Sequence, residues 1–130
     1  MTAPTLRTPQ QAVLELSRRL DDALRLAGLD PAPSLAALDE IAGVKSHRIR
    51  PAALATAQGI ELTEVLGGRV FWADTYEVAR ALDAALRAAG VLAPPSHVVW
   101  GTAGNRIIPP WLSFGQTEQL VKKIMQGARQ

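Results

Sequence analysis

The residues best suited to bind a polyanion form one short basic segment. Its members are Lys45, Ser46, His47, Arg48 and Arg50. Ammonium and guanidinium groups neutralise phosphates, and an imidazole among them can contact phosphate as well. No carboxylate occurs from position 41 to position 60, so the segment predicts a surface that faces phosphate. A solvated surface without a partner is the other interpretation of so short a run.

The distribution of charge supports this interpretation more than the total charge does. The chain of 130 residues has a net charge of +2, which is too small to establish a nucleic-acid partner. Residues 1–83 carry nine Lys/Arg and eleven Asp/Glu, whereas residues 84–130 carry five Lys/Arg and one Glu. The length and the hydrophobic content of 48% are sufficient for one domain with a core.

Sequence patterns for catalysis, cofactors and metals are missing. There is no cysteine, which excludes disulfides, thiol chemistry and cysteine-ligated zinc. The two histidines, His47 and His97, are not part of a close His/Asp/Glu cluster that would bind a metal. The glycine-rich stretch 101–104 lacks the Gly-Lys-Ser/Thr ending of a phosphate-binding loop. We therefore expect no enzymatic activity, no cofactor and no metal site.

Helical elements must position the basic segment, and residues 51–65 predict two of them. Ala55, Gly59 and Val65 have the spacing of the small residue, the turn glycine and the buried branched residue of a helix-turn-helix unit. Glycine suits the turn because it tolerates positive φ. The second helix of such a unit lies in a major groove, and Thr63 would then contact DNA.

A winged helix is the alternative for the same part of the chain. Residues 60–66 and 69–72 could pair across two glycines as a β-hairpin, and Arg69 would then lie on the wing. The two helices would shift to residues 34–43 and 45–58, which places the basic segment on or before the helix that reads DNA. Pro51 counts against an unbroken helix there, but the charges fit this arrangement better.

Capping patterns and apolar periodicity predict three further helices. One begins at Thr8 and ends at Gly28, one begins at Asp74 and ends at Gly90, and the last covers residues 117–126. Residues 97–100 are interpreted as a short strand or a helical turn, and residues 106–110 as extended. The chain is divided into an N-terminal amphipathic helix (1–33), a DNA-binding core (34–90) and an accessory or partner-binding segment (91–130). No internal repeat is expected.

Three tryptophans, Trp72, Trp100 and Trp111, are the largest side chains. Burial in the core is the usual role of tryptophan in a chain with so few aromatic residues. An exposed anchor for a protein partner is the alternative, because tryptophan is enriched among the residues that dominate interfaces. Trp111 is the best candidate for such an anchor, since no helical periodicity surrounds it.

The order of motifs from Leu54 to Gly127 resembles the Xre-type antitoxins whose C-terminal domain binds a toxin. A connecting helix at 76–82 is followed by Trp100, by Asn105-Arg106, by Pro-Trp-Leu at 110–112 and by Leu-Val at 120–121. The resemblance implies a protein partner for residues 97–127, with contacts at Trp100, Asn105, Arg106 and Trp111. Residues 34–90 are also similar to winged-helix regulators with a MerR-like or excisionase-like head. Both resemblances imply DNA binding.

These patterns predict a mainly α fold with a helix-turn-helix or winged-helix core and at most one small β-hairpin, near residues 60–73. We expect a homodimer that binds double-stranded DNA as a small transcriptional regulator or antitoxin-like repressor, because two half-sites supply contacts that one helix lacks. The alternative is a non-enzymatic component of a phage or another multiprotein assembly. Because no membrane-length apolar run or signal-peptide core is present, we expect a cytoplasmic protein without membrane contact.

Overall fold

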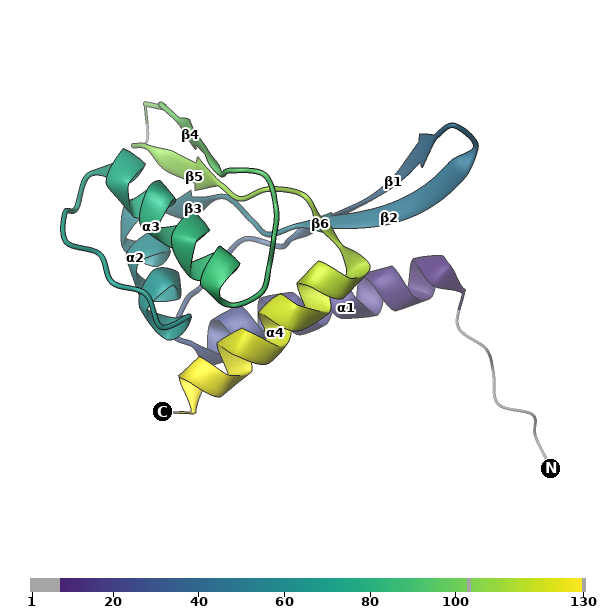
Figure 1. Cartoon of the computed structure of the whole chain (residues 1–130), viewed down its shortest axis with the longest axis horizontal. Helices are drawn as coiled ribbons and strands as arrows, with labels where there is room; N and C mark the ends of the chain where they lie inside the picture. Colours follow the sequence, from purple (N-terminus) through teal and green to yellow (C-terminus); the bar gives the residue numbers. More distant parts are fainter. Residues whose placement is uncertain (1–7, 103, 130) are drawn as a thin grey trace.

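The computed structural model describes residues 8–102 and 104–129. Figure 1 shows a body of helices and short strands from which one long hairpin projects. In chain order the elements are α1 (Pro9–Leu26), β1 (Leu35–Ile41), β2 (Val44–Arg50), β3 (Leu54–Ala55), α2 (Thr56–Val65), α3 (Thr75–Ala88), β4 (His97–Val99), β5 (Arg106–Ile108), β6 (Leu112–Ser113) and α4 (Phe114–Ala128). Within the described residues the strands form two three-stranded antiparallel sheets, ordered β1-β2-β6 and β3-β5-β4.

The fold is mixed α and β, so the prediction of a mainly α protein with a helix-turn-helix or winged-helix core is wrong. Residues 34–43, expected as a helix of the winged-helix alternative, contain strand β1, which pairs along its whole length with β2. Ala42 and Gly43 turn the chain with φ of 54° and 80°, and such a left-handed pair matches the twist of a two-residue hairpin. The apolar spacing of this segment fits a helix in isolation, but pairing with β2 decides its conformation.

Gly59 lies inside a helix and makes no turn. α2 runs through it without interruption, so residues 54–65 form no helix-turn-helix and residues 60–72 form no wing. A Cβ at Gly59 would lie 2.8 Å from Ile107 Cδ1 and 2.9 Å from Val78 Cγ1. The glycine is therefore required for the close packing of α2 against α3 and β5 rather than for chain reversal.

The predicted starts of two helices are confirmed. Thr8 and Gln11 form the capping box of α1, and the Asp74 side chain accepts a hydrogen bond from the backbone of α3. α4 begins three residues earlier than predicted, because Ser113 and Gln116 form a capping box of their own. Residues 97–99, interpreted as a short strand or a helical turn, are strand β4.

Contrary to the expectation from the sequence, the chain consists of two related halves. The first half contains α1, β1, β2, β3 and α2, and the second contains α3, β4, β5, β6 and α4, in the same order. Residues 20–34 and 82–96 are identical at nine of fifteen positions, and residues 48–62 and 106–120 at six of fifteen. Equivalent positions are thus 62 residues apart before the hairpin turn and 58 apart after it, because the second hairpin is shorter.

The two halves exchange their short strands. β6 of the second half pairs with β2 of the first, and β3 of the first half pairs with β5 of the second. The two registers are equivalent, because Leu112 opposes Ile49 and Leu54 opposes Ile107. All four side chains are at most 1% exposed. Each sheet therefore contains a buried apolar pair with one residue from each half.

The helices pair across the halves in the same way. α1 packs against α4, and α2 packs against α3, as the arrangement of the two pairs in Figure 1 shows. Leu, Ile, Val and Ala side chains from both halves form one core cluster. Burial of such side chains contributes most of the stabilisation of a domain of this size, so neither half carries a complete core of its own.

Buried polar contacts are repeated as well. Asp21 accepts a hydrogen bond of 3.1 Å from the backbone nitrogen of Ser34, and Asp83 accepts one of 3.1 Å from that of Ser96. Each aspartate ties a helix to the start of the following hairpin. Burial raises the pKa of the Asp21 carboxyl above its ordinary value of 3.8, while the hydrogen bonds from Ser34 act in the opposite direction.

Candidate partner-binding grooves

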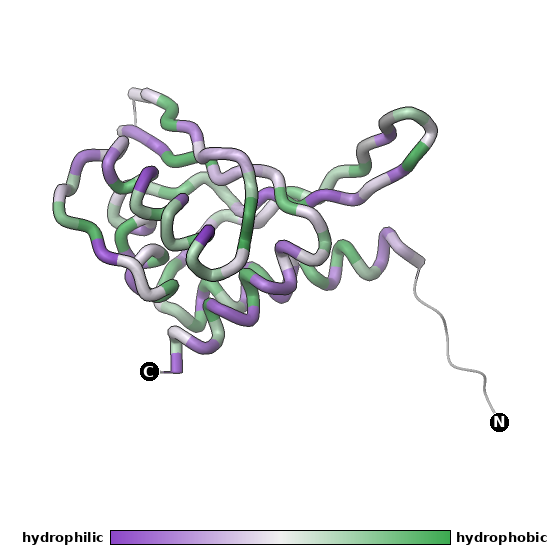
Figure 2. The backbone as a smooth tube through the Cα atoms, in the orientation of Figure 1, coloured by the Kyte–Doolittle hydropathy of each residue, from purple (hydrophilic) through white to green (hydrophobic). Residues whose placement is uncertain are grey.

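The β1–β2 hairpin, residues 35–50, projects from the body, and we call it the first arm (Figure 1). Its strands pair one to one over seven residues each, without a bulge. The third strand, β6, reaches only Arg48 and Ile49, so the outer part of the arm is two-stranded. Figure 2 shows hydrophobic residues at its far end. Because an isolated two-stranded ribbon is marginal in water, these features are typical of a segment that contacts a partner.

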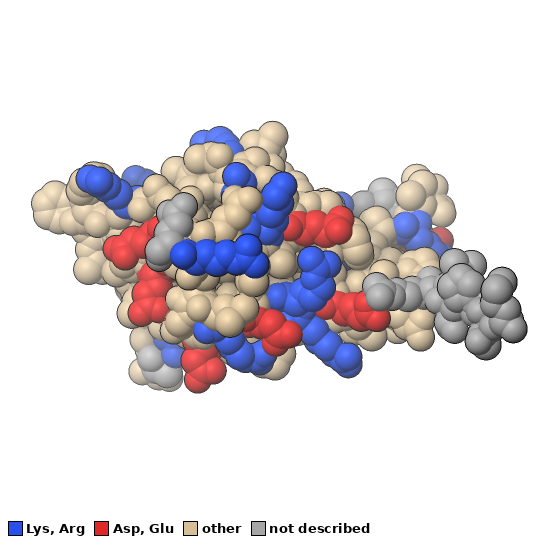
Figure 3. Space-filling view, turned by 90° about the horizontal axis from the view of Figure 1, so that it is seen from below, with Lys and Arg blue, Asp and Glu red and all other residues tan. Residues whose placement is uncertain are grey.

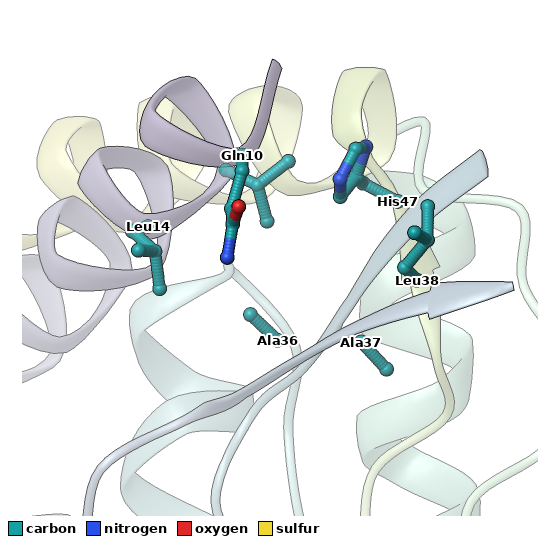
Figure 4. A pocket seen from close by; sticks show the side chains of 7 residues that line it. Gln10, Leu14, Ala36, Ala37, Leu38 and His47 are labelled. Carbon is teal, nitrogen blue, oxygen red and sulfur yellow. The ribbon is translucent and has the colours of Figure 1, made fainter. Parts of the chain in front are cut away.

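A cavity of about 180 Å³ lies between the first arm and the N-terminal half of α1, and we call it the first groove. In Figure 4, Gln10 and Leu14 extend from α1 toward the strands, and Leu38 and His47 extend from the arm. The full lining is Gln10, Val13, Leu14, Ala36, Ala37, Leu38 and His47. Leu14 is 44% exposed and Leu38 is 52% exposed. The groove thus presents aliphatic surface that the chain leaves uncovered.

A second hollow adjoins the first groove near His47. Its lining is Pro9, Ala12, Val13, Ser46, His47, Ser113, Phe114 and Gly115. Val13 and His47 line both hollows, and Phe114 is 37% exposed. The imidazole of His47 is therefore a polar group between two mainly apolar surfaces, where it can form a hydrogen bond to a bound segment.

The equivalent place in the second half carries aromatic rings. The residues 62 positions after Gln10, Leu14 and Leu38 are Trp72, Tyr76 and Trp100. Trp100 Nε1 donates a hydrogen bond of 3.0 Å to Tyr76 Oη, and the two ring centroids are 5.6 Å apart. Tilted aromatic pairs of this kind contribute about 0.5–1.5 kcal/mol beyond their burial. One scaffold therefore holds an aromatic pair in the second half and an open groove in the first.

Aromatic side chains lie at the surface of the described part of the chain. None of them belongs to the hydrophobic core cluster that those residues form. Phe71 is 81% exposed, Trp72 71%, Trp100 63% and Tyr76 45%. Phe71 and Trp72 belong to the loop between α2 and α3, and Tyr76 lies in the first turn of α3. Exposure of several large apolar side chains in one region is typical of a binding surface.

The other expected contacts to a protein partner are less accessible than Trp100. The guanidinium of Arg50 lies 5.0 Å from the ring centroid of Trp111, a cation–π contact that occupies one side of a half-buried indole. Asn105 donates to Thr75 Oγ1 over 3.3 Å, and Arg106 Nη1 donates to the Asn105 carbonyl over 3.2 Å. Trp111 therefore contacts Arg50, whereas Trp100 contacts Tyr76.

The basic segment lies in β2 rather than on a helix. Lys45 is exposed near the tip of the first arm, opposite Glu40. Ser46, His47 and Arg48 follow along the same strand, all of them half-buried. The expected contacts to DNA are therefore spread along an arm, and alternate residues face opposite sides of it.

Thr63 and Arg69 lie in other elements. Thr63 in α2 is fully buried and donates its hydroxyl to the Gly59 carbonyl over 2.7 Å, so it has no surface for a DNA contact. Arg69 is exposed in the loop between α2 and α3, where the structure has no wing.

Cations do not form a uniform surface on the face made by α1 and α4. Figure 3 shows Lys and Arg side chains there next to Asp and Glu side chains. One such pair is Arg25 with Asp22, whose charged atoms are 3.0 Å apart. Mixed charges of this kind are typical of an ordinary solvated surface and do not single out a polyanion.

Sequence reasoning missed four residues of these surfaces: Leu14, Leu38, Phe71 and Tyr76. It interpreted the region of Leu38 as a helix and did not consider Leu14 or Tyr76 as surface residues. The internal repeat is the signal that could have found Leu14, Leu38 and Tyr76, because it aligns Leu14 with Tyr76 and Leu38 with Trp100.

Comparison with protein-family models, curated proteins and solved structures gives no match to this chain. The residues described by the structure contain no group of three or more His, Cys, Asp or Glu side chains arranged to hold a metal ion. In the same residues, no helix has both the length and the apolar character needed to cross a membrane.

Proposed function

We propose that this protein is a non-enzymatic assembly component that binds protein partners at two surfaces. One is the first groove, and the other is the exposed aromatic surface of the second half. The observation that carries the proposal is the exposure of Trp72 and Trp100, at 71% and 63%, beside Tyr76. Tryptophan and tyrosine are the side chains that most often dominate the binding energy of a protein interface. The first groove, with its uncovered Leu14 and Leu38, offers a second apolar surface of the same kind.

The chemistry of both surfaces favours a protein partner over a polyanion. Arg50 is stacked on Trp111, and Lys45 lies opposite Glu40 in the register of the arm. A phosphate-binding surface needs cations that are not already balanced by nearby acids. Apolar and aromatic side chains, in contrast, gain free energy when a partner removes them from water.

Replacing both exposed tryptophans is expected to abolish partner binding while the fold is retained. Trp72→Ser/Trp100→Ser removes two apolar anchors whose loss costs about 2 kcal/mol or more each at a typical interface. Chemical crosslinking of the wild-type protein in its source extract, followed by mass spectrometry, identifies the partner, and calorimetry with the purified partner measures the affinity. We expect at least about a hundredfold weaker binding.

Leu92→Ser is the matched control, because Leu92 is 67% exposed and does not line the first groove or the adjoining hollow. It should bind like the wild-type protein. Circular dichroism checks that the folded content of all variants is equal. The proposal is refuted when the double variant binds the same partners with unchanged affinity.

Binding of double-stranded DNA through the first arm and the equivalent β4–β5 hairpin is the second candidate. The observation in its favour is the projecting two-stranded ribbon with Lys45 near its tip, because a ribbon of this kind fits a major groove. The two related halves would supply a two-fold arrangement within one chain, and a homodimer would double it. This candidate predicts an affinity for duplex DNA that decreases steeply with salt, and a shallower slope for Lys45→Ala/Arg48→Ala than for Lys122→Ala/Lys123→Ala. Absence of binding at about 50 mM salt rejects it.

A further inference from the structure

We propose that the first groove receives the aromatic loop of a second copy of this chain, so that copies associate head to tail. The aromatic loop is residues 66–74, between α2 and α3, with Phe71 and Trp72 as its exposed side chains. The proposal rests on the proposed function, because it names the partner of one of the two surfaces. In this arrangement an aromatic side chain of the loop of one copy binds in the first groove of the next copy.

The second half of the chain indicates what the first groove accepts. At the positions equivalent to Leu14 and Leu38 the second half carries Tyr76 and Trp100. The shorter side chains leave the cavity of about 180 Å³ where the second half holds rings. The same helix and hairpin positions therefore hold a ring pair in the second half and frame an open groove in the first, where a ring supplied by another molecule would take the equivalent place.

The aromatic loop supplies such rings. Phe71 is 81% exposed and Trp72 is 71% exposed, and the loop has no helix or strand between Gly67 and Asp74. Gly67 has a φ of 91°, a left-handed conformation that ends α2 and directs the chain into the loop. Removing these two side chains from water provides the driving force for docking.

The positions of the two surfaces require association between copies. In Figure 1 the α2–α3 loop lies at one end of the molecule and the first arm projects from the other, so one copy does not fill its own groove. Such a heterologous contact repeats from copy to copy. Neither surface carries charge of one sign only, because the loop has Arg69 and Asp74, and the arm has two carboxylates and three Lys/Arg side chains.

Two complementary variants test the proposal. Phe71→Ser/Trp72→Ser removes both aromatic side chains of the loop and leaves the groove open. Leu14→Tyr/Leu38→Trp installs in the first groove the pair that the second half already holds, and leaves the loop intact. The second half shows that this scaffold accommodates the pair, so the groove variant should fold; circular dichroism and thermal unfolding check both variants.

Sedimentation velocity across a concentration series up to about 100 µM is the measurement. We expect the wild-type protein to form species larger than a dimer as its concentration increases. Each variant alone should remain a monomer, and an equimolar mixture should form a complex of two chains that does not grow further, because only one loop and one groove remain compatible. Leu92→Ser should associate like the wild-type protein.

A wild-type protein that stays monomeric over the whole series overturns the proposal, as does a mixture that forms no two-chain complex. These results are distinct from failure of the proposed function. A monomeric protein whose capture of another partner still depends on Trp72 and Trp100 overturns the second copy as occupant and retains the assembly function. Capture that is independent of both tryptophans overturns the assembly function itself.

Discussion

Replacing Leu54 with alanine is expected to lower the free energy of unfolding of the whole chain by about 2–5 kcal/mol, and replacing Leu112 should have an effect of similar size. The two leucines are equivalent residues of the exchanged strands β3 and β6, and they are 0% and 1% exposed. Each opposes a buried isoleucine of the other half, Ile107 for Leu54 and Ile49 for Leu112. Truncation leaves a cavity at the seam between the halves, so neither half can relax independently.

Urea unfolding followed by circular dichroism measures both effects. We expect one cooperative transition with an unchanged denaturant slope and a lower midpoint, and faster amide exchange in both sheets of each variant. Leu92→Ala is the control, because its side chain is 67% exposed and its loss should change the stability little. If Leu54→Ala opened only the sheet of β3, β4 and β5 while β1 and β2 kept their protection, the two sheets would open independently and this account of the fold would be wrong.

Gly59→Ala is expected to destabilise the protein by about 1–3 kcal/mol, although alanine is the better helix former. The added Cβ would lie 2.8 Å and 2.9 Å from side-chain carbons of Ile107 and Val78. Both neighbours are 0% exposed, so they have little room to move. The effect of overpacking should therefore exceed the gain in helix propensity. Thermal unfolding monitored at 222 nm measures the change.

Gly115→Ala provides the matched comparison. Gly115 also lies in a helix, and nothing lies within 4 Å of a Cβ at this position. The same substitution should there be neutral or increase the free energy of unfolding by up to about 1 kcal/mol. Equal effects at the two glycines would contradict the close packing of α2 against α3 and β5.

Local patterns predicted the starts of α1 and α3 because the determinants of these starts are local. The capping box of Thr8 and Gln11 and the cap at Asp74 satisfy backbone groups within a few residues, so the sequence alone determines these starts. β1 was missed because its apolar spacing also fits a helix. Its conformation is set by pairing with β2, whose carboxyl end is held by strand β6 from more than sixty residues later in the chain.

The exposed aromatic surface was predicted only in part. The sequence offered exposure as the alternative to burial for all three tryptophans and favoured Trp111, whereas Trp72 and Trp100 are the exposed ones and Trp111 is half-buried. The first groove could not be derived from any local pattern, because it is formed by α1 and a hairpin that was taken for a helix. Gly59 was misinterpreted for a related reason: a glycine needed for tight packing and one needed for a turn look alike until the neighbouring chain is known.

The strand exchange has a consequence for how the sequences of the two equivalent surfaces can change. In a symmetric pair of identical chains, every substitution appears at both sites, so the two sites cannot diverge. Here the two related halves are encoded separately within one polypeptide, while the shared sheets keep them in a fixed relation. The two hairpins differ in length, and of the two only the second carries a tryptophan, so one scaffold can present two different surfaces whose sequences can change independently.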